Sequence, residues 1–72
     1  MIWERNGDLF TATVETPTGE ARFHLTVERL CTQIWDWTVW QSAQPGQPGR
    51  LAYYGTAPTA QVAMLAAEQA AS

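Results

Sequence analysis

His24 and Cys31 are the first residues to consider for chemistry, because each is the only residue of its type in the chain. A thiol beside an imidazole that takes its proton can act as a nucleophile. The two residues lie near opposite ends of one predicted strand, so we do not expect them to meet. We expect His24 to be an ordinary surface histidine and Cys31 to be a small buried hydrophobic residue.

Other patterns that would support catalysis or metal binding do not occur in the sequence. One cysteine and one histidine are too few for a usual zinc site. Glu28 and Asp36 share a predicted surface, where two solvated carboxylates are the ordinary case. The segment GQPGR, residues 46–50, does not show the strand before it and the helix after it that a phosphate-binding loop requires. We therefore predict a protein that is not an enzyme, with no catalytic residue, metal or cofactor.

Aromatic side chains are the stronger candidates for function. The segment IWDWTVW, residues 34–40, contains three of the four tryptophans. In a strand, Trp35 and Trp37 point to one face, and Trp40 points to the opposite face with the polar residues. An exposed aromatic ring near an arginine is typical of the centre of a protein interface. The predicted binding residues are Trp40, Arg22, His24 and Tyr54.

Two alternatives stay open for this polar face. In the first, Trp40 packs under the segment SAQPGQPGR, residues 42–50, whose two Pro-Gly pairs indicate a long exposed loop. In the second, the face binds single-stranded nucleic acid, because some sheet proteins stack bases on aromatic rings. Charge argues against nucleic acid as the partner. Four arginines, no lysine and seven acidic residues give a net charge of −3, and the sequence pI is about 4.8, whereas nucleic-acid binders carry basic patches.

The first two long strands are predicted from a period of two in the sequence. Residues 9–16 and 21–29 alternate apolar and polar side chains, and the PTGE segment at 17–20 between them suits a hairpin turn. A register in which Glu15 faces Arg22 places the apolar residues of both strands on one side. A slip by one residue would break both the apolar and the polar pairings, so the sequence predicts this register.

A third long strand is predicted over residues 33–41, after a short connection from the second. With this connection, the apolar residues of the second and third long strands lie side by side. On the polar face, Arg22 would then lie beside Trp40, and His24 would lie beside Thr38.

Shorter strands are predicted at both sides of these three. The segment LAYYG, residues 51–55, is rich in residues that favour strands and places Tyr53 and Tyr54 on opposite faces. The segment MIWER, residues 1–5, is a candidate edge strand that precedes an Asn6-Gly7 turn.

A helix is predicted over residues 60–71, where alanine dominates. Thr59 is the expected N-cap. Helical projection places small residues on one side, with a larger residue at its flank: Ala63, Ala66 and Ala70, with Val62. Because small side chains let a helix approach a sheet closely, we expect this side to cover Trp35 and Trp37.

These elements predict a single α+β domain over residues 1–72, with an antiparallel β-meander of three to five strands and one C-terminal α-helix packed on one face. The stretch from WDWTVW through YYGTAPTAQVAMLAAEQAA resembles small uncharacterised bacterial and phage proteins, over half the chain. This resemblance implies no activity and no functional residues. The topology also resembles double-stranded-RNA-binding and integrase arm-binding domains, which carry basic residues where this chain has Thr and Glu.

The function predicted from these features is that of a small non-enzymatic protein-interaction module, phage-related or an accessory subunit. Another protein is the expected partner, and self-pairing of an edge strand into a homodimer is left open. The chain has no apolar run near the roughly 20 residues of a membrane span. A single cysteine and the absence of a signal-peptide pattern predict a cytoplasmic location.

Overall fold

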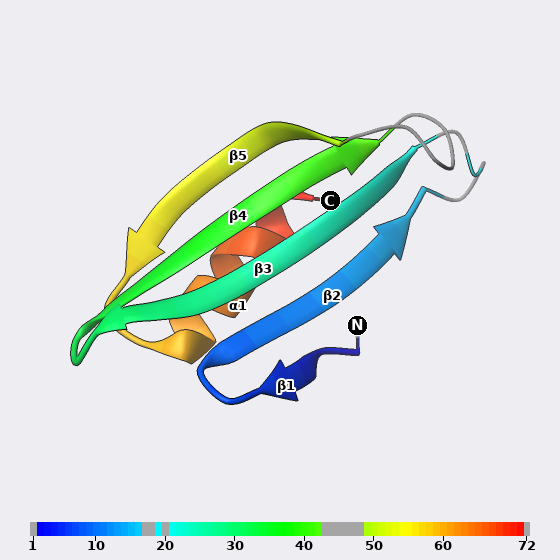
Figure 1. Ribbon diagram of the computed structural model, residues 1–72. Helices are drawn as coiled ribbons and strands as arrows, with labels where there is room; N and C mark the ends of the chain where they lie inside the picture. The colour runs from blue at the N-terminus through cyan, green and yellow to red at the C-terminus, as the bar shows by residue number, and fades with distance from the viewer. Residues whose placement is uncertain (1, 17–18, 20, 43–48, 72) are drawn as a thin grey trace.

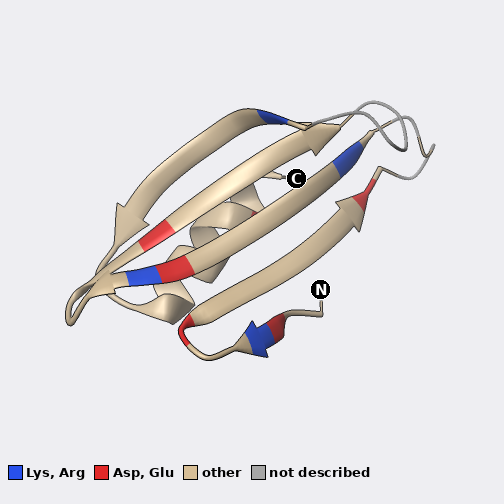
Figure 2. Ribbon diagram, viewed as in Figure 1, with Lys and Arg blue, Asp and Glu red and all other residues tan. Residues whose placement is uncertain are grey.

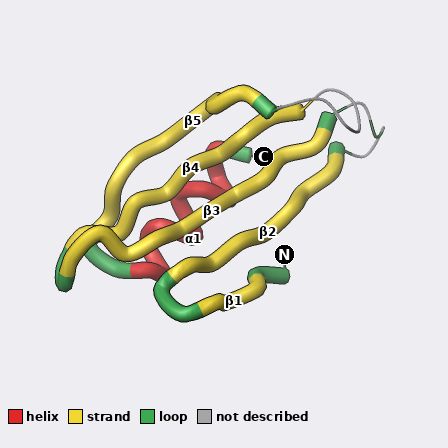
Figure 3. Tube along the Cα trace, in the orientation of Figure 1, coloured by secondary structure: helices red, strands yellow, loops and turns green. Residues whose placement is uncertain are grey.

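The computed structural model describes residues 2–16, 19, 21–42 and 49–71, which form one sheet and one helix (Figure 1). In chain order the elements are β1 (Glu4–Asn6), β2 (Leu9–Glu15), β3 (Arg22–Cys31), β4 (Ile34–Ser42), β5 (Arg50–Ala57) and α1 (Ala60–Ala70). The strands lie in the order β1-β2-β3-β4-β5, and every neighbouring pair is antiparallel. Figure 3 shows the strands as one curved layer with α1 across a single face. The predicted α+β meander with its helix on one face is confirmed.

The β2–β3 hairpin has the register that the sequence predicts, with Glu15 opposite Arg22. Beyond this pair, the backbone N–H of Thr16 donates to the carbonyl of Ala21 at 3.0 Å, and the Ala21 N–H donates to the Thr16 hydroxyl at 3.2 Å. Gly19 has a φ of 73°, in the left-handed region that glycine enters without steric cost. The other residues of the predicted 17–20 turn lie outside the described residues. Alternation on two strands was therefore sufficient to predict this pairing.

The predicted register between β3 and β4 is wrong by two residues. Arg22 lies opposite Ser42 rather than Trp40, and His24 lies opposite Trp40 rather than Thr38. The predicted register fails because the connection between the two strands differs from the expected one. β3 continues to Cys31, which pairs with Ile34 around a two-residue turn. A shift of two residues leaves every side chain on its predicted face, since strands have a period of two.

Cys31 is exposed, so the prediction that it is buried is wrong. It lies where β3 turns into β4, at the tip of the sheet (Figure 1). The register between the two strands is also irregular between Arg29 and Cys31. A residue at the end of a hairpin has few neighbours that can cover it.

The flanking strands are present with shifted limits. Asn6 pairs with Leu9, so the first turn consists of Gly7 and Asp8 rather than Asn6 and Gly7. Gly7 has a φ of 65°, which suits this tight turn. At the other side, the predicted strand at 51–55 is confirmed within the longer β5. The predicted loop at 42–50 lies largely outside the described residues, because 43–48 are not described.

The core lies between the sheet and α1, whose small side chains allow close approach. Ala63 and Ala67 have no solvent exposure, and each packs against a cluster of buried strand residues. Larger, partly buried side chains surround these clusters: Trp3, Phe10, Val14, Phe23, Trp35, Trp37 and Met64. The prediction that Trp35 and Trp37 lie on the helix-covered side is confirmed.

The buried side of α1 is rotated from the predicted one. Ala67 is fully buried, whereas Ala66 is only half-buried and Val62 is 47% exposed. On the opposite flank, Met64 packs against the core and Glu68 accepts a hydrogen bond from Trp3 Nε1 at 2.8 Å. These contacts draw that flank of the helix toward the N-terminal segment and turn Val62 away from the core.

Candidate binding face

The sheet has one face that α1 does not cover, and Figure 1 is viewed from that side, with the helix behind the strands. We call this the open face. Alternate residues of each strand belong to it, as the strand registers show. Across its middle lie Thr11, Thr13, His24, Thr26, Thr38, Trp40, Leu51 and Tyr54. All four predicted binding residues are on this face.

Large apolar side chains gather on the open face at β4 and β5. Trp40 is 39% exposed, Leu51 is 43% exposed and Tyr54 is 72% exposed. Trp40 lies opposite Leu51, and Thr38, two residues before Trp40, lies opposite Tyr54. We call Trp40, Leu51 and Tyr54 the aromatic patch.

Leu51 belongs to this patch because β5 contains an irregularity. Val39 pairs with Tyr53 and Trp40 pairs with Leu51, so Ala52 is an extra residue on β5. In a regular strand Leu51 and Tyr54 would point to opposite faces, and the bulge brings them to the same face. Alternation in LAYYG carries no signal for this bulge, so the sequence analysis missed Leu51.

Hydroxyl groups fix the indole of Trp40 on the open face. Trp40 Nε1 donates a hydrogen bond to Thr38 Oγ1 at 3.1 Å, and the hydroxyls of Thr38 and Thr26 are hydrogen bonded to each other. The polar edge of the indole is therefore satisfied within the protein. A partner that covers the ring gains contact area without removing the indole N–H from its hydrogen bond.

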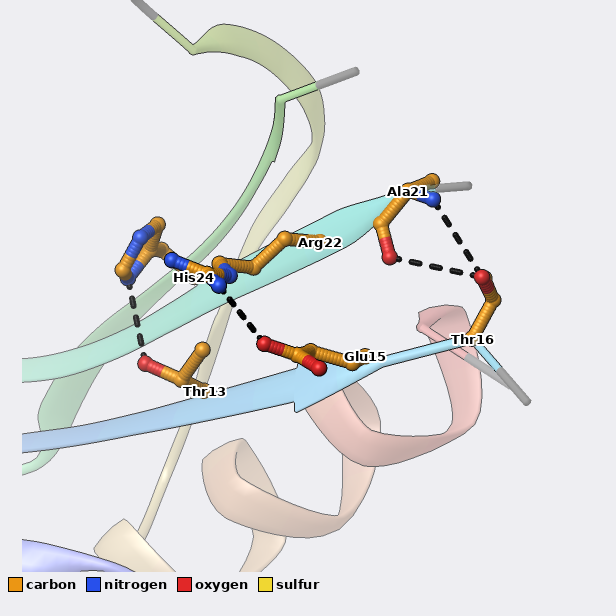
Figure 4. A network of polar contacts seen from close by, with 6 residues as sticks. All are labelled: Thr13, Glu15, Thr16, Ala21, Arg22 and His24. Atoms are coloured by element: carbon orange, nitrogen blue, oxygen red, sulfur yellow. Dashed lines mark hydrogen bonds and ion pairs between the residues drawn. The ribbon is translucent and has the colours of Figure 1, made fainter. Parts of the chain in front are cut away.

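His24 is the direct cross-strand neighbour of Trp40 on β3. Its Nδ1 lies 3.2 Å from Thr13 Oγ1 on β2, as Figure 4 shows. His24 therefore lies between Thr13 on β2 and Trp40 on β4. The hydrogen bond to the Thr13 hydroxyl holds the imidazole beside Trp40 as part of the exposed surface.

Arg22 lies at the border of the open face rather than beside Trp40. Its Nη2 is 2.7 Å from Glu15 Oε1, and the two side chains are 45% and 56% exposed (Figure 4). The predicted cross-strand ion pair is thus confirmed, but an exposed pair of this kind contributes at most about 1 kcal/mol to stability. The guanidinium is directed at β2, away from the aromatic patch.

Charged residues lie toward the ends of the sheet, as Figure 2 shows for the strand positions. At the end near the β3–β4 turn, Glu28 and Asp36 are directly opposed on the open face. Within the described strands, the acidic residues of the open face are Glu4, Glu15, Glu28 and Asp36, and the basic residue is Arg22. The open face therefore combines an apolar patch with a net negative charge that lies toward the ends of the sheet.

No group of three histidine, cysteine or acidic side chains in the described part of the chain is placed to hold a metal ion. His24 and Cys31 lie at different positions along β3, and each is exposed. The arrangement that the structure does provide is a flat, partly apolar surface.

A second exposed surface lies on α1, where helical projection of the sequence places Leu65 toward the polar side. Leu65 is 56% exposed, and a shallow depression beside it is lined by Gln61, Met64, Leu65 and Glu68.

Comparison of the chain with known protein families, with curated proteins and with solved structures finds no significant match. The function is therefore inferred from the surfaces of the molecule. Among the described residues, no helix combines the length and the apolar character that crossing a membrane would require.

Proposed function

We propose that the protein is a non-enzymatic interaction module that binds a segment of another protein on its open face. The observation that carries this proposal is the aromatic patch, whose Trp40 and Tyr54 are 39% and 72% exposed on the sheet face that none of the described elements covers. Tryptophan and tyrosine are enriched among the residues that dominate binding energy. Both carry a large apolar area on a side chain with few rotatable bonds.

The residues around the patch suggest the chemistry of the partner. Threonine hydroxyls on β2, β3 and β4 can donate and accept hydrogen bonds at the edge of an apolar contact. Glu28 and Asp36 lie directly opposite each other, and like charges in this arrangement repel. A lysine or arginine of the partner placed between them would relieve this repulsion. We therefore infer a partner segment that presents an apolar side chain next to a basic one.

Substitution of Trp40→Ala tests the proposal. We expect the variant to keep its fold, because the indole lies on the open face outside the two core clusters. We expect it to bind its partner at least about 30-fold more weakly, since a dominant interface residue contributes about 2 kcal/mol or more. Capture of partners by tagged protein, followed by calorimetric titration of the captured partner, measures the change.

Leu30→Ala is the matched control, because Leu30 is 59% exposed near the end of β3 and lies outside the aromatic patch. It should leave the affinity unchanged. If Trp40→Ala retains the circular dichroism spectrum of the wild type and still captures every partner, the open face is not the binding surface.

Binding of single-stranded nucleic acid is the second candidate, favoured by the exposed rings of Trp40 and Tyr54. The acidic residues around the patch oppose it, because phosphates would be repelled. We expect no shift of single-stranded oligonucleotides in a gel at low salt. A salt-dependent shift that Trp40→Ala abolishes would instead favour nucleic acid over a protein partner.

A further inference from the structure

The two edges of the sheet differ in how well they are protected. The β1 edge has only three residues, two of which are the charged Glu4 and Arg5. The β5 edge has eight residues, and its single charge is Arg50 at the start. Short strands and charges are the devices by which proteins prevent edge strands from pairing with other chains. β5 lacks both devices over most of its length, and its β-bulge, a third such device, lies at Ala52, outside the regular stretch 53–57.

Exposed apolar side chains flank the β5 edge on both faces of the sheet. On the open face, Tyr54 is 72% exposed. On the helix-covered face, Tyr53 lies opposite the buried Val39 and is nevertheless 52% exposed. An edge strand that is apolar on both faces is suited to continuation of the sheet by another strand.

The helix α1 adds a further exposed apolar residue, Val62, on the side of the molecule where the β5 edge lies. Glu68 accepts a hydrogen bond from Trp3, which precedes β1, and Met64 lies one turn earlier on the same flank of α1. Val62 lies on the opposite flank of α1, which therefore faces β5, and it is 47% exposed. Tyr53 and Val62 thus expose apolar surface on the same side of the sheet, next to the free edge.

We infer that a second copy of this chain pairs its β5 antiparallel with the β5 edge, joining two sheets into one. In antiparallel pairing, directly opposed residues share a face, so the two-fold axis stands perpendicular to the sheet and passes midway between one residue and the same residue of the second copy. The bulge at Ala52 leaves Tyr53–Ala57 as the regular part of the strand, with Gly55 at its centre. Pairing about Gly55 places Tyr54 opposite Thr56 of the second copy.

Charge is compatible with this association even though each chain carries a net charge of −3. Residues 51–57 contain no charged side chain, so like charges are not brought together at the pairing strands. Both helices lie on the same side of the joined sheet, and the Tyr53 and Val62 surfaces of the two copies are brought toward each other. The open faces become continuous on the other side.

The double substitution Tyr53→Lys/Thr56→Lys tests the inference by placing one lysine on each face of the edge, as natural edge strands do. For the wild type we expect a sedimentation-equilibrium mass that rises to twice the 8.0 kDa of the chain between micromolar and millimolar concentrations. For the variant we expect at least a tenfold weaker dimer, with the circular dichroism spectrum unchanged.

Ile2→Lys/Leu30→Lys is the matched control, because it adds the same charge at positions that are 86% and 59% exposed and that lie before β1 and in β3, outside the β5 edge. It should dimerise like the wild type. A wild type that stays at 8.0 kDa over the whole concentration range overturns the inference, and so does equal dissociation of both double variants.

Hydrogen exchange keeps the inference testable if the double variant fails to fold. In an edge strand, alternate backbone amides point outward to solvent. In the wild type, the hydrogen exchange of these β5 amides should slow as the protein concentration rises. The exchange of the β1 amides should not change. Protection that does not depend on concentration contradicts the dimer. Trp40→Ala should dimerise normally, so failure of this inference is distinguishable from failure of the proposed function.

Discussion

At the scale of the residue, the absence of a side chain at Gly55 is what allows Trp37 to lie across the neighbouring strand. Gly55 is the cross-strand partner of Trp37, and a Cβ atom at Gly55 would lie 2.7 Å from Trp37 Cζ2. That distance is well inside the 3.5–4.0 Å of a favourable carbon–carbon contact. The indole therefore uses the surface of the glycine backbone as part of its packing site.

Gly55→Ala should destabilise the protein by about 1–3 kcal/mol, the usual cost of overpacking a core contact. Elsewhere in a strand, replacing glycine by alanine is stabilising, because glycine loses more entropy on folding. The sign of the effect thus distinguishes a steric contact from a backbone preference. Chemical denaturation of both proteins at one concentration measures the difference in the free energy of unfolding.

Two variants control this experiment. Gly49→Ala should be nearly neutral, because its nearest contact would be the Gln41 carbonyl oxygen at 3.4 Å. In a Trp37→Leu background, Gly55→Ala should lose most of its cost, since the ring atoms that it meets are gone. If Gly55→Ala lowers the free energy of unfolding equally in both backgrounds, contact with the Trp37 ring does not explain why alanine is unfavourable at position 55.

At the scale of the element, α1 depends on a cap at its start and on small residues along one side. Thr59 is the N-cap, and its Oγ1 accepts a hydrogen bond from the N–H of Val62 at 3.2 Å. The first turn contains no acidic residue and the last turn no basic residue, so side-chain charges do not support the helix dipole. A helix of 11 residues is marginal in isolation. It is therefore stabilised by the cap and by burial of Ala63 and Ala67 against the sheet.

Thr59→Ala should lower the free energy of unfolding by about 1 kcal/mol, because it leaves the Val62 amide without its capping acceptor. In a domain of this size, that change corresponds to a drop in melting temperature of about 4–8 °C. Thr59→Ser keeps the hydroxyl and should be nearly neutral. If the alanine and serine variants melt together, the Thr59 hydroxyl contributes nothing to the start of the helix.

At the scale of the whole molecule, the architecture follows from patterns that are continuous in the sequence. Alternation over residues 9–16 and 21–29 predicted both the pairing and the register of β2 and β3, because two faces had to agree at once. The alanine-rich segment predicted α1 with its cap. These features depend on many residues that point to the same answer.

The features that the sequence did not predict depend on single irregular residues. The β3–β4 register was missed because the sequence of the turn does not reveal that Cys31 pairs with Ile34. Leu51 was missed because a bulge at Ala52 reverses its face. The predicted binding residues Trp40, His24 and Tyr54 do lie near one another on the open face, whereas Arg22 is displaced to the border by the same register shift.

The order of the strands has a consequence for synthesis of the protein. Each strand pairs with the one before it in the chain, so the meander can assemble step by step as the chain leaves the ribosome. Its apolar side, however, packs against α1, which is translated after all five strands. Until residues 60–70 emerge, the nascent sheet exposes Leu25, Val27 and Val39 to solvent and to chaperones. A ribosome that stalls at this stage would leave a chain prone to aggregation.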